Sequence, residues 1–140
     1  MTTYGSAAWK GGLKDGIGVI STKSGALKDH PYGFVARFEG GPGTNPEELI
    51  GAAHAGCFTM ALSLILGEAG FTADQMDTKA EITLTKQDDA FAITKSALTL
   101  RAKISGIDEA KFAELAGKAK ASCPVSKLLT CEITLDAALA

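Results

Sequence analysis

The three cysteines are the residues whose chemistry can be placed first, because each lies in a different kind of segment. Cys57 lies midway along an apolar segment, Cys123 directly precedes a proline, and Cys131 lies near the end of the chain. An odd number of cysteines in a chain of 140 residues, long enough to bury a core, does not indicate a disulfide framework. Each cysteine is therefore either apolar filling or a reactive thiol.

The two earlier cysteines differ in what could stabilise a thiolate. Proline favours the first turn of a helix, so Cys123 is predicted at or near an N-cap, where free N–H groups and the helix dipole favour the anion. Cys57, in mid-helix, would need a cation brought from elsewhere. A structural buried thiol remains the alternative for both. Cys131 shares the apolar face of a predicted strand and is best explained as core filling.

His54 precedes Cys57 by three residues and therefore shares its helix face. This spacing suits a Cys–His thiolate pair, a Cys–His hydrolase or half of a metal site. The chain has only one other histidine, His30, and no paired-cysteine motif, which disfavours zinc. The simplest interpretation is a histidine that packs the helix.

Two carboxylates open the same helix, where both favour the helix dipole. At about 100° per residue, Glu48 lies opposite Cys57, whereas Glu47 is about 80° from it. Glu48 is therefore the better cap and Glu47 the better inward carboxylate. Glu47 is nevertheless about 15 Å from Cys57 along the axis. If both serve one site, a second copy of the helix must run antiparallel beside the first, which predicts a two-fold dimer with shared sites.

The helix that carries these residues has the strongest start signal in the chain. Asn45 can cap it, Pro46 suits its first position, and Glu48 completes a capping-box pattern. It is expected to run from Pro46 to about Glu68. Because it is apolar almost all round, it is predicted to be a long, buried central helix, and its small middle residues would let another backbone approach.

The remaining segments predict an α+β fold in the order β-β-β-α-β-β-α-α-β, within a single domain over residues 1–140. Short strands are expected at 5–10, 16–22 and 33–39, long antiparallel strands at 76–86 and 91–104, and a last strand at 130–139. Asp108 is expected to cap an amphipathic helix, and a short helix is expected at 124–129.

Composition narrows the choice of partners and location. The net charge is -2 and no basic run occurs, so neither nucleic acid nor an anionic membrane surface is expected as a partner. Residues 1–10 lack the apolar core of a signal peptide. The longest apolar stretch, 52–66, contains polar residues and is expected to be too short and too polar to span a bilayer. A cytoplasmic location is predicted.

Two motifs resemble the osmotically inducible protein C / organic hydroperoxide resistance (OsmC/Ohr) family. One is Asn-Pro-Glu-Glu-Leu at 45–49, which leads to the helical Cys57, and the other is Cys-Pro-Val-Ser at 123–126. The resemblance covers essentially the whole chain and is nearest to the osmotically inducible branch. Further matching segments are 31–34, 37–40 and 66–71.

The resemblance implies an intertwined homodimer, a role in oxidative and osmotic stress defence, and thiol-dependent reduction of organic hydroperoxides without a metal or cofactor. Carried over residue by residue, Cys57 matches the peroxidatic cysteine and Cys123 the resolving one. Glu47 matches the site carboxylate, and Arg37 matches the arginine of this branch. In the sister branch the arginine comes from an earlier position, where this chain has Lys14. The implied reductant is an external dithiol of the lipoyl type.

These residue types suit peroxide chemistry. A thiolate attacks a peroxide oxygen, expels an alcohol and becomes a sulfenic acid, which a second thiol condenses to a disulfide. A guanidinium lowers the thiol pKa, and a carboxylate beside it fixes its orientation. The apolar neighbours Phe58, Met60 and Leu64 favour an alkyl or aryl peroxide over hydrogen peroxide. Two alternatives stay open: a non-enzymatic carrier of small apolar molecules at the dimer interface, and a Cys–His hydrolase that uses His54.

Overall fold

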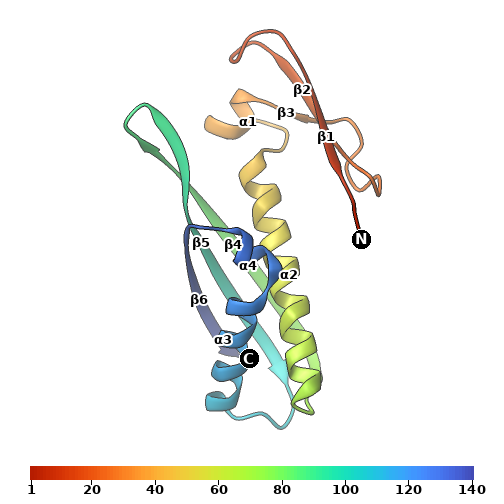
Figure 1. Ribbon diagram of the computed structural model, residues 1–140, viewed down its shortest axis with the longest axis vertical. Helices are drawn as coiled ribbons and strands as arrows, with labels where there is room; N and C mark the ends of the chain where they lie inside the picture. The colour runs from red at the N-terminus through yellow and green to blue at the C-terminus, as the bar shows by residue number, and fades with distance from the viewer. The chain divides into compact units, whose positions relative to one another are not determined.

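The computed structural model describes residues 1–140, which divide into two compact units, Met1–Leu49 and Ile50–Ala140. Figure 1 shows the elements along the chain. Whether the two units make the single domain expected from the sequence stays a prediction. The elements are β1 (Gly5–Lys10), β2 (Ile17–Thr22), β3 (His30–Tyr32), α1 (Phe34–Phe38), α2 (Pro46–Glu68), β4 (Ala73–Gln87), β5 (Ala90–Ile104), α3 (Glu109–Ser122), α4 (Pro124–Leu128) and β6 (Glu132–Leu139).

The first unit is built on a small antiparallel sheet in the order β1-β2-β3. Trp9 on β1 and Tyr32 on β3 meet edge to face, with ring centroids 5.5 Å apart. Gly18 on β2 lies under both rings, because a Cβ there would come within 2.4 Å of Trp9 and 2.6 Å of Tyr32. The glycine therefore lets the two aromatic rings cover the sheet.

The predicted strand at 33–39 is wrong: Phe34–Phe38 forms the short helix α1, and the strand before it is β3. Five residues are too few for periodicity alone to separate a strand from a helical turn. The contact that favours the helix is between Phe34 and Phe38, one turn apart, with ring centroids 5.0 Å apart. The order of elements therefore gains a helix before α2.

Helix α2 runs over Pro46–Glu68, the bounds predicted from the sequence. The Asn45 side chain caps it by accepting the Glu48 N–H at 2.9 Å, as predicted. The reciprocal half of the capping box is not formed, because the Glu48 carboxylate accepts the Thr44 hydroxyl instead. The cap is therefore a single side-chain bond, held in place by the loop before the helix.

The second unit contains a mixed sheet in the order β4-β5-β6. β4 and β5 form the expected antiparallel hairpin, but β6 pairs parallel with β5. The prediction of purely antiparallel sheets is therefore wrong for β6. The reason is the connection: the chain leaves β5, crosses through α3 and α4, and returns to the starting end of β5, as a parallel neighbour requires.

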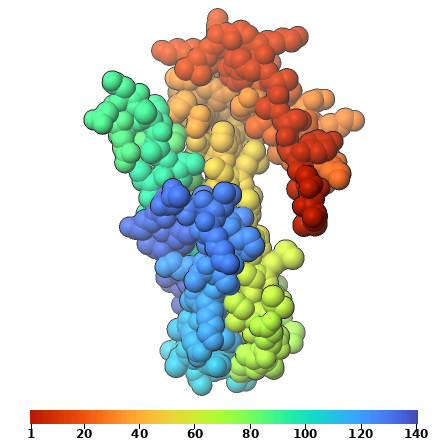
Figure 2. Space-filling view, in the orientation of Figure 1, coloured from red at the N-terminus to blue at the C-terminus, as the bar shows by residue number.

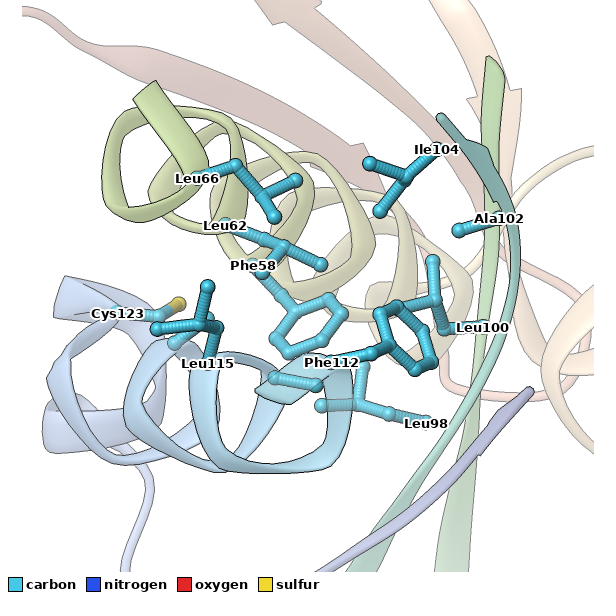
Figure 3. Packing of buried hydrophobic residues seen from close by; sticks show 12 residues of the cluster. Phe58, Leu62, Leu66, Leu98, Leu100, Ala102, Ile104, Phe112, Leu115 and Cys123 are labelled. Carbon is cyan, nitrogen blue, oxygen red and sulfur yellow. The ribbon is translucent and has the colours of Figure 1, made fainter. Parts of the chain in front are cut away.

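The core of the second unit lies between one face of this sheet and the helices α2 and α3 (Figure 3). Alternate residues of β5 point into it, since side chains alternate along a strand. Phe58, Leu62 and Leu66 supply the α2 side and Phe112 and Leu115 the α3 side. The buried β5 residues are Ser96, Leu98, Leu100, Ala102 and Ile104.

Helix α2 is buried on one side only within a single chain. Met60 is 77% exposed and Leu64 65% exposed, so the predicted burial on every side is not met by this chain alone. By length and composition the helix could cross a membrane, contrary to the expectation for residues 52–66. Its Phe58 face lies in the core, however, and the core helix of a soluble protein passes the same composition test.

Candidate active site

The structure brings Cys57 and Cys123 together although 66 positions separate them in the sequence (123 − 57). Their side chains are hydrogen-bonded to each other, and both thiols are free. Cys57 is half-buried on α2, whereas Cys123 is fully buried at the junction of α3 and α4. The predicted N-cap position of Cys123 is confirmed. Two neighbouring free thiols are the residues between which a disulfide can form.

Local hydrogen bonds favour the anion on Cys123. Burial, the largest single effect, raises the pKa of the Cys123 thiol. Hydrogen bonds from the Cys57 thiol, from the N–H and hydroxyl of Ser126 and from the Val125 N–H outweigh it, so the pKa lies below its ordinary value. Cys123 is therefore the thiol of the pair that its surroundings prepare to ionise.

The surroundings of Cys57 disfavour its ionisation. Burial and then the hydrogen bond with Cys123 raise the pKa of the Cys57 thiol, and the Val125 N–H offsets only part of this. No charged side chain contributes to that balance. The sequence argument that a mid-helix thiol needs an added cation thus agrees with the electrostatics.

Arg37 and Glu47, both in the first unit, form the guanidinium–carboxylate pair expected from the sequence. The Arg37 Nη2 donates to Glu47 Oε1 at 2.6 Å, and Nε donates to Oε1 at 3.1 Å and to Oε2 at 3.2 Å. The Glu47 residue is only 8% exposed, while the Arg37 side chain remains 37% exposed. Lys14 instead lies 5.8 Å from the Phe34 ring centroid. The carboxylate therefore fixes a guanidinium that still faces outward.

His54 packs the helix, the simplest of its sequence interpretations. The ring is completely buried, with Nδ1 2.6 Å from the Ser96 hydroxyl oxygen and Nε2 2.8 Å from that of Ser126. Both nitrogens are engaged with serines, so neither is directed at Cys57 as a Cys–His hydrolase requires. No group of three or more His, Cys, Asp or Glu residues is placed to hold a metal ion.

Sequence reasoning assigned no role to Ser96 and Ser126. Ser96 interrupts the apolar alternation of β5, and a polar residue on a buried strand face is a signal for a buried partner. Ser126 was noted only as the last residue of the Cys-Pro-Val-Ser motif, three positions after the N-cap Cys123, where a side chain can reach back to the cap. Both signals were present in the sequence, but neither identifies His54 as the hydrogen-bond partner.

Cys131 does not lie in the core cluster, contrary to the sequence interpretation. It is half-buried in the bend that precedes β6, which begins at Glu132. The strand starts two residues later than the predicted range of 130–139, so the alternation that placed Cys131 on an apolar face begins only after it.

An apolar groove of about 680 Å³ lies beside Cys57. Its walls come from the C-terminal half of α2 and from the α3–α4 junction, whose surfaces are adjacent in Figure 2. Met60 and Leu64 line it, as their positions beside Cys57 predicted. Phe58 does not, because it points into the core. The other lining residues are Ala61, Ile65, Ser122 and Pro124. An alkyl or aryl group fits such a surface better than a polar ligand.

Burial lowers the pKa of His54 below its ordinary value of 6.5. Below pH 6.5, His54 binds a proton in the unfolded chain but stays neutral in the folded chain until the pH reaches its lower folded pKa. The stability that the neutral ring contributes is present above pH 6.5 and is lost as the pH falls toward the folded pKa. We expect the unfolding free energy to lose up to about 1.4 kcal/mol per pH unit in this window. Thermal unfolding of the wild type and His54→Gln between about pH 7.5 and 5.5 measures it.

The control for this prediction is His30→Gln, because His30 lies on the exposed strand β3. It should keep the wild-type dependence on pH, whereas His54→Gln should lose part of it. Equal slopes for wild type and His54→Gln would contradict a buried, neutral histidine.

Comparison with known proteins finds relatives that are named peroxiredoxin or organic hydroperoxide resistance protein. The family model described as OsmC-like protein matches residues 39–138. The chain is 59% identical over 132 residues to peroxiredoxin OsmC of Escherichia coli, covering 94% of this chain and 92% of that protein. It is 35% identical over 92 residues to the organic hydroperoxide resistance protein OhrB of Bacillus subtilis, covering 66% of each. The crystal structure of the B. subtilis OhrB superposes with a TM-score of 0.70 at 28% identity, covering 100% of this chain and 98% of that one.

Proposed function

The chain belongs to the OsmC-like protein family and is a peroxidase, and from this premise we propose that it reduces organic hydroperoxides to alcohols. Cys57 acts as the attacking thiolate and Cys123 as the resolving thiol. The observation that carries the proposal is the hydrogen-bonded pair of free thiols beside an apolar groove. Relatives named for organic hydroperoxide resistance support the substrate class.

The reaction follows from this arrangement. The Cys57 thiolate attacks the terminal peroxide oxygen, the O–O bond breaks, and the alkoxide leaves and takes a proton to become the alcohol. Cys57 is left as a sulfenic acid beside Cys123. Attack by the Cys123 sulfur forms the disulfide and expels water. An external dithiol, of the lipoyl type, then reduces the disulfide. Neither a metal nor a cofactor takes part.

The attacking thiolate needs a cation, since its surroundings in the second unit raise the pKa of Cys57. The Arg37 guanidinium, fixed by Glu47, supplies it in our proposal and stabilises charge on the leaving oxygen. Glu47 and Cys57 lie ten positions apart on α2, about 15 Å along its axis. The guanidinium that serves Cys57 is therefore proposed to come from a second copy of the chain.

The exposed side of α2 supports such a homodimer. Met60 and Leu64 are large apolar side chains left in water, and Ala52, Ala53 and Gly56 on the same exposed side are small enough for another helix to approach closely. Burying this side against an antiparallel copy would remove the apolar surface from water. The same packing would bring Glu47 of each chain toward Cys57 of the other. The cytoplasmic location expected from the sequence remains a prediction.

Oxidation by one equivalent of an alkyl hydroperoxide tests the thiol assignment. We expect one equivalent of the alcohol, together with an intramolecular disulfide between Cys57 and Cys123, because these are the two thiols in contact. Cys131 should remain reduced, since it lies outside this pair. Alkylation followed by peptide mapping measures the pairing, and finding Cys131 bonded to Cys57 with Cys123 reduced would contradict it.

A further inference from the structure

A line of buried polar side chains leads from the sheet to the resolving thiol, and the reaction described above uses none of them. It runs from Ser96 on β5 to His54 on α2, then to Ser126 on α4 and to the Cys123 thiol. Ser96, His54 and Cys123 are completely buried, and Ser126 is 8% exposed. Three separate elements thus bring polar groups to one thiol inside an apolar core.

The number of protons available fixes the direction of these hydrogen bonds. A serine hydroxyl has one hydrogen, and a neutral imidazole has one N–H and one acceptor nitrogen. When the Ser126 hydroxyl donates to Cys123, its oxygen can only accept from His54, so His54 carries its proton on Nε2. His54 Nδ1 is then an acceptor, and the Ser96 hydroxyl donates to it at 2.6 Å. Every group in the line is satisfied in this single arrangement.

We propose that His54 and Ser126 are positioning residues of the resolving step, which orient a hydroxyl donor toward the Cys123 sulfur and so favour its thiolate form. The proposal rests on the proposed function, in which Cys123 resolves the oxidised Cys57. Neither residue touches the peroxide. Ser126 touches the sulfur of Cys123, and His54 acts through Ser126.

The step that benefits is disulfide formation. The Cys123 thiolate attacks the sulfur of the Cys57 sulfenic acid, the S–S bond forms, and the S–O bond breaks. The electron pair leaves with the hydroxide, which takes the proton that Cys123 had given up and becomes water. No other oxidant or reductant is needed. The rate depends on the fraction of Cys123 that is ionised, which a donor to the sulfur raises.

The Ser126 hydroxyl matters because few groups around Cys123 favour its ionisation. The pKa of Cys123 responds to burial, to Cys57 on α2, and to Ser126 and Val125 on α4, and no charged side chain is among these groups. His54 is the only other titratable group in the line, and burial lowers its pKa so that it stays neutral. Hydrogen bonds rather than a neighbouring cation therefore favour ionisation of Cys123, and the Ser126 hydroxyl is one of the few groups that donate them.

The pKa of Cys123 can be measured without peroxide in a chain that carries Cys57→Ser and Cys131→Ser, where it is the only thiol. Thiolate absorbance followed against pH reports its ionisation. We expect Ser126→Ala to raise the pKa by about one unit, which means about tenfold less thiolate at pH values below both pKa values. Ser126→Thr keeps the hydroxyl and should restore the wild-type value.

Two further variants separate positioning from packing. His54→Gln offers an amide N–H in place of Nε2–H and should change the pKa less than Ser126→Ala does. Thr94→Val removes a hydroxyl of β5 that pairs with Thr85 at 2.7 Å and has no part in the line. It should leave the pKa of Cys123 unchanged, which controls for loss of a hydroxyl from the same sheet.

Single-turnover kinetics with the three-cysteine chain supply the second measurement. Ser126→Ala should leave formation of the Cys57 sulfenic acid at its wild-type rate and slow disulfide formation by about tenfold at neutral pH. If the alanine variant does not fold, ¹⁵N-labelled histidine in the wild type replaces it: the His54 Nε2 signal should shift at the pH where Cys123 ionises. An unmoved pKa and resolution rate in Ser126→Ala, or an unmoved His54 signal, would overturn the proposal.

Failure of the proposed function would look different. A wild-type chain that forms no Cys57–Cys123 disulfide with any hydroperoxide would contradict the resolving step itself. The pKa comparison in the single-thiol chain would still decide whether His54 and Ser126 hold the thiolate.

Discussion

Replacing Cys57 with serine is expected to abolish hydroperoxide reduction, lowering the turnover rate by at least about a thousandfold. The hydroxyl of serine does not ionise at neutral pH and does not attack a peroxide oxygen as a thiolate does. The measurement is consumption of an alkyl hydroperoxide in the presence of a dithiol. The matched control is Cys131→Ser, which removes a half-buried thiol outside the pair and should keep nearly wild-type activity.

The same assay separates the other functions that the sequence left open. A carrier of small apolar molecules would bind its ligand in the groove equally well with serine at Cys57, and would consume no peroxide. A Cys–His hydrolase would cleave an ester and depend on a contact between His54 and Cys57. Undiminished peroxide consumption by Cys57→Ser would contradict the assignment of Cys57 as the nucleophile.

Two inactive variants are expected to restore activity when they are mixed. Cys57→Ser removes the proposed nucleophile, and Glu47→Ala removes the carboxylate that fixes the Arg37 guanidinium, so either variant alone should be nearly inactive. In a heterodimer whose sites each combine residues of both chains, one of the two sites has Cys57, Glu47 and Arg37 intact. Activity should therefore appear after unfolding and refolding of the mixture, at up to about half the value per heterodimer of the wild type.

The control is Glu48→Ala, because Glu48 neighbours Glu47 but binds the Thr44 hydroxyl rather than Arg37. Its homodimer should be active without complementation. If each site instead lies within one chain, every site of the heterodimer lacks either Cys57 or Glu47. The mixture would then stay inactive, which would refute the two-chain site.

Several parts of this molecule are determined by consecutive residues alone. The bounds of α2 follow from Asn45, Pro46 and the apolar run behind them, because capping and side-chain periodicity act within a few residues. The N-cap at Cys123 follows from the proline after it. The motifs at 45–49 and 123–126 were enough to indicate the family, and with it the peroxidase activity that the comparisons show.

Only the tertiary structure decided what these segments contact. The parallel pairing of β6 depends on where the α3–α4 connection returns to the sheet, which no strand pattern records. Phe34 and Phe38 suit a strand face as well as a helical turn, and in the structure they pack against each other one helical turn apart. Both errors arose where the local sequence pattern fits two structures.

The candidate site shows the same division. The sequence patterns and the family resemblance identified Cys57, Cys123, Arg37 and Glu47 as candidate site residues. The contact between the two thiols joins segments that are far apart in the chain. The partners of His54 lie 42 and 72 positions away, so its spacing from Cys57 pointed to the wrong neighbour. The residue type determines which reaction a side chain can perform. Packing between distant segments determines which groups contact that side chain and shift its pKa.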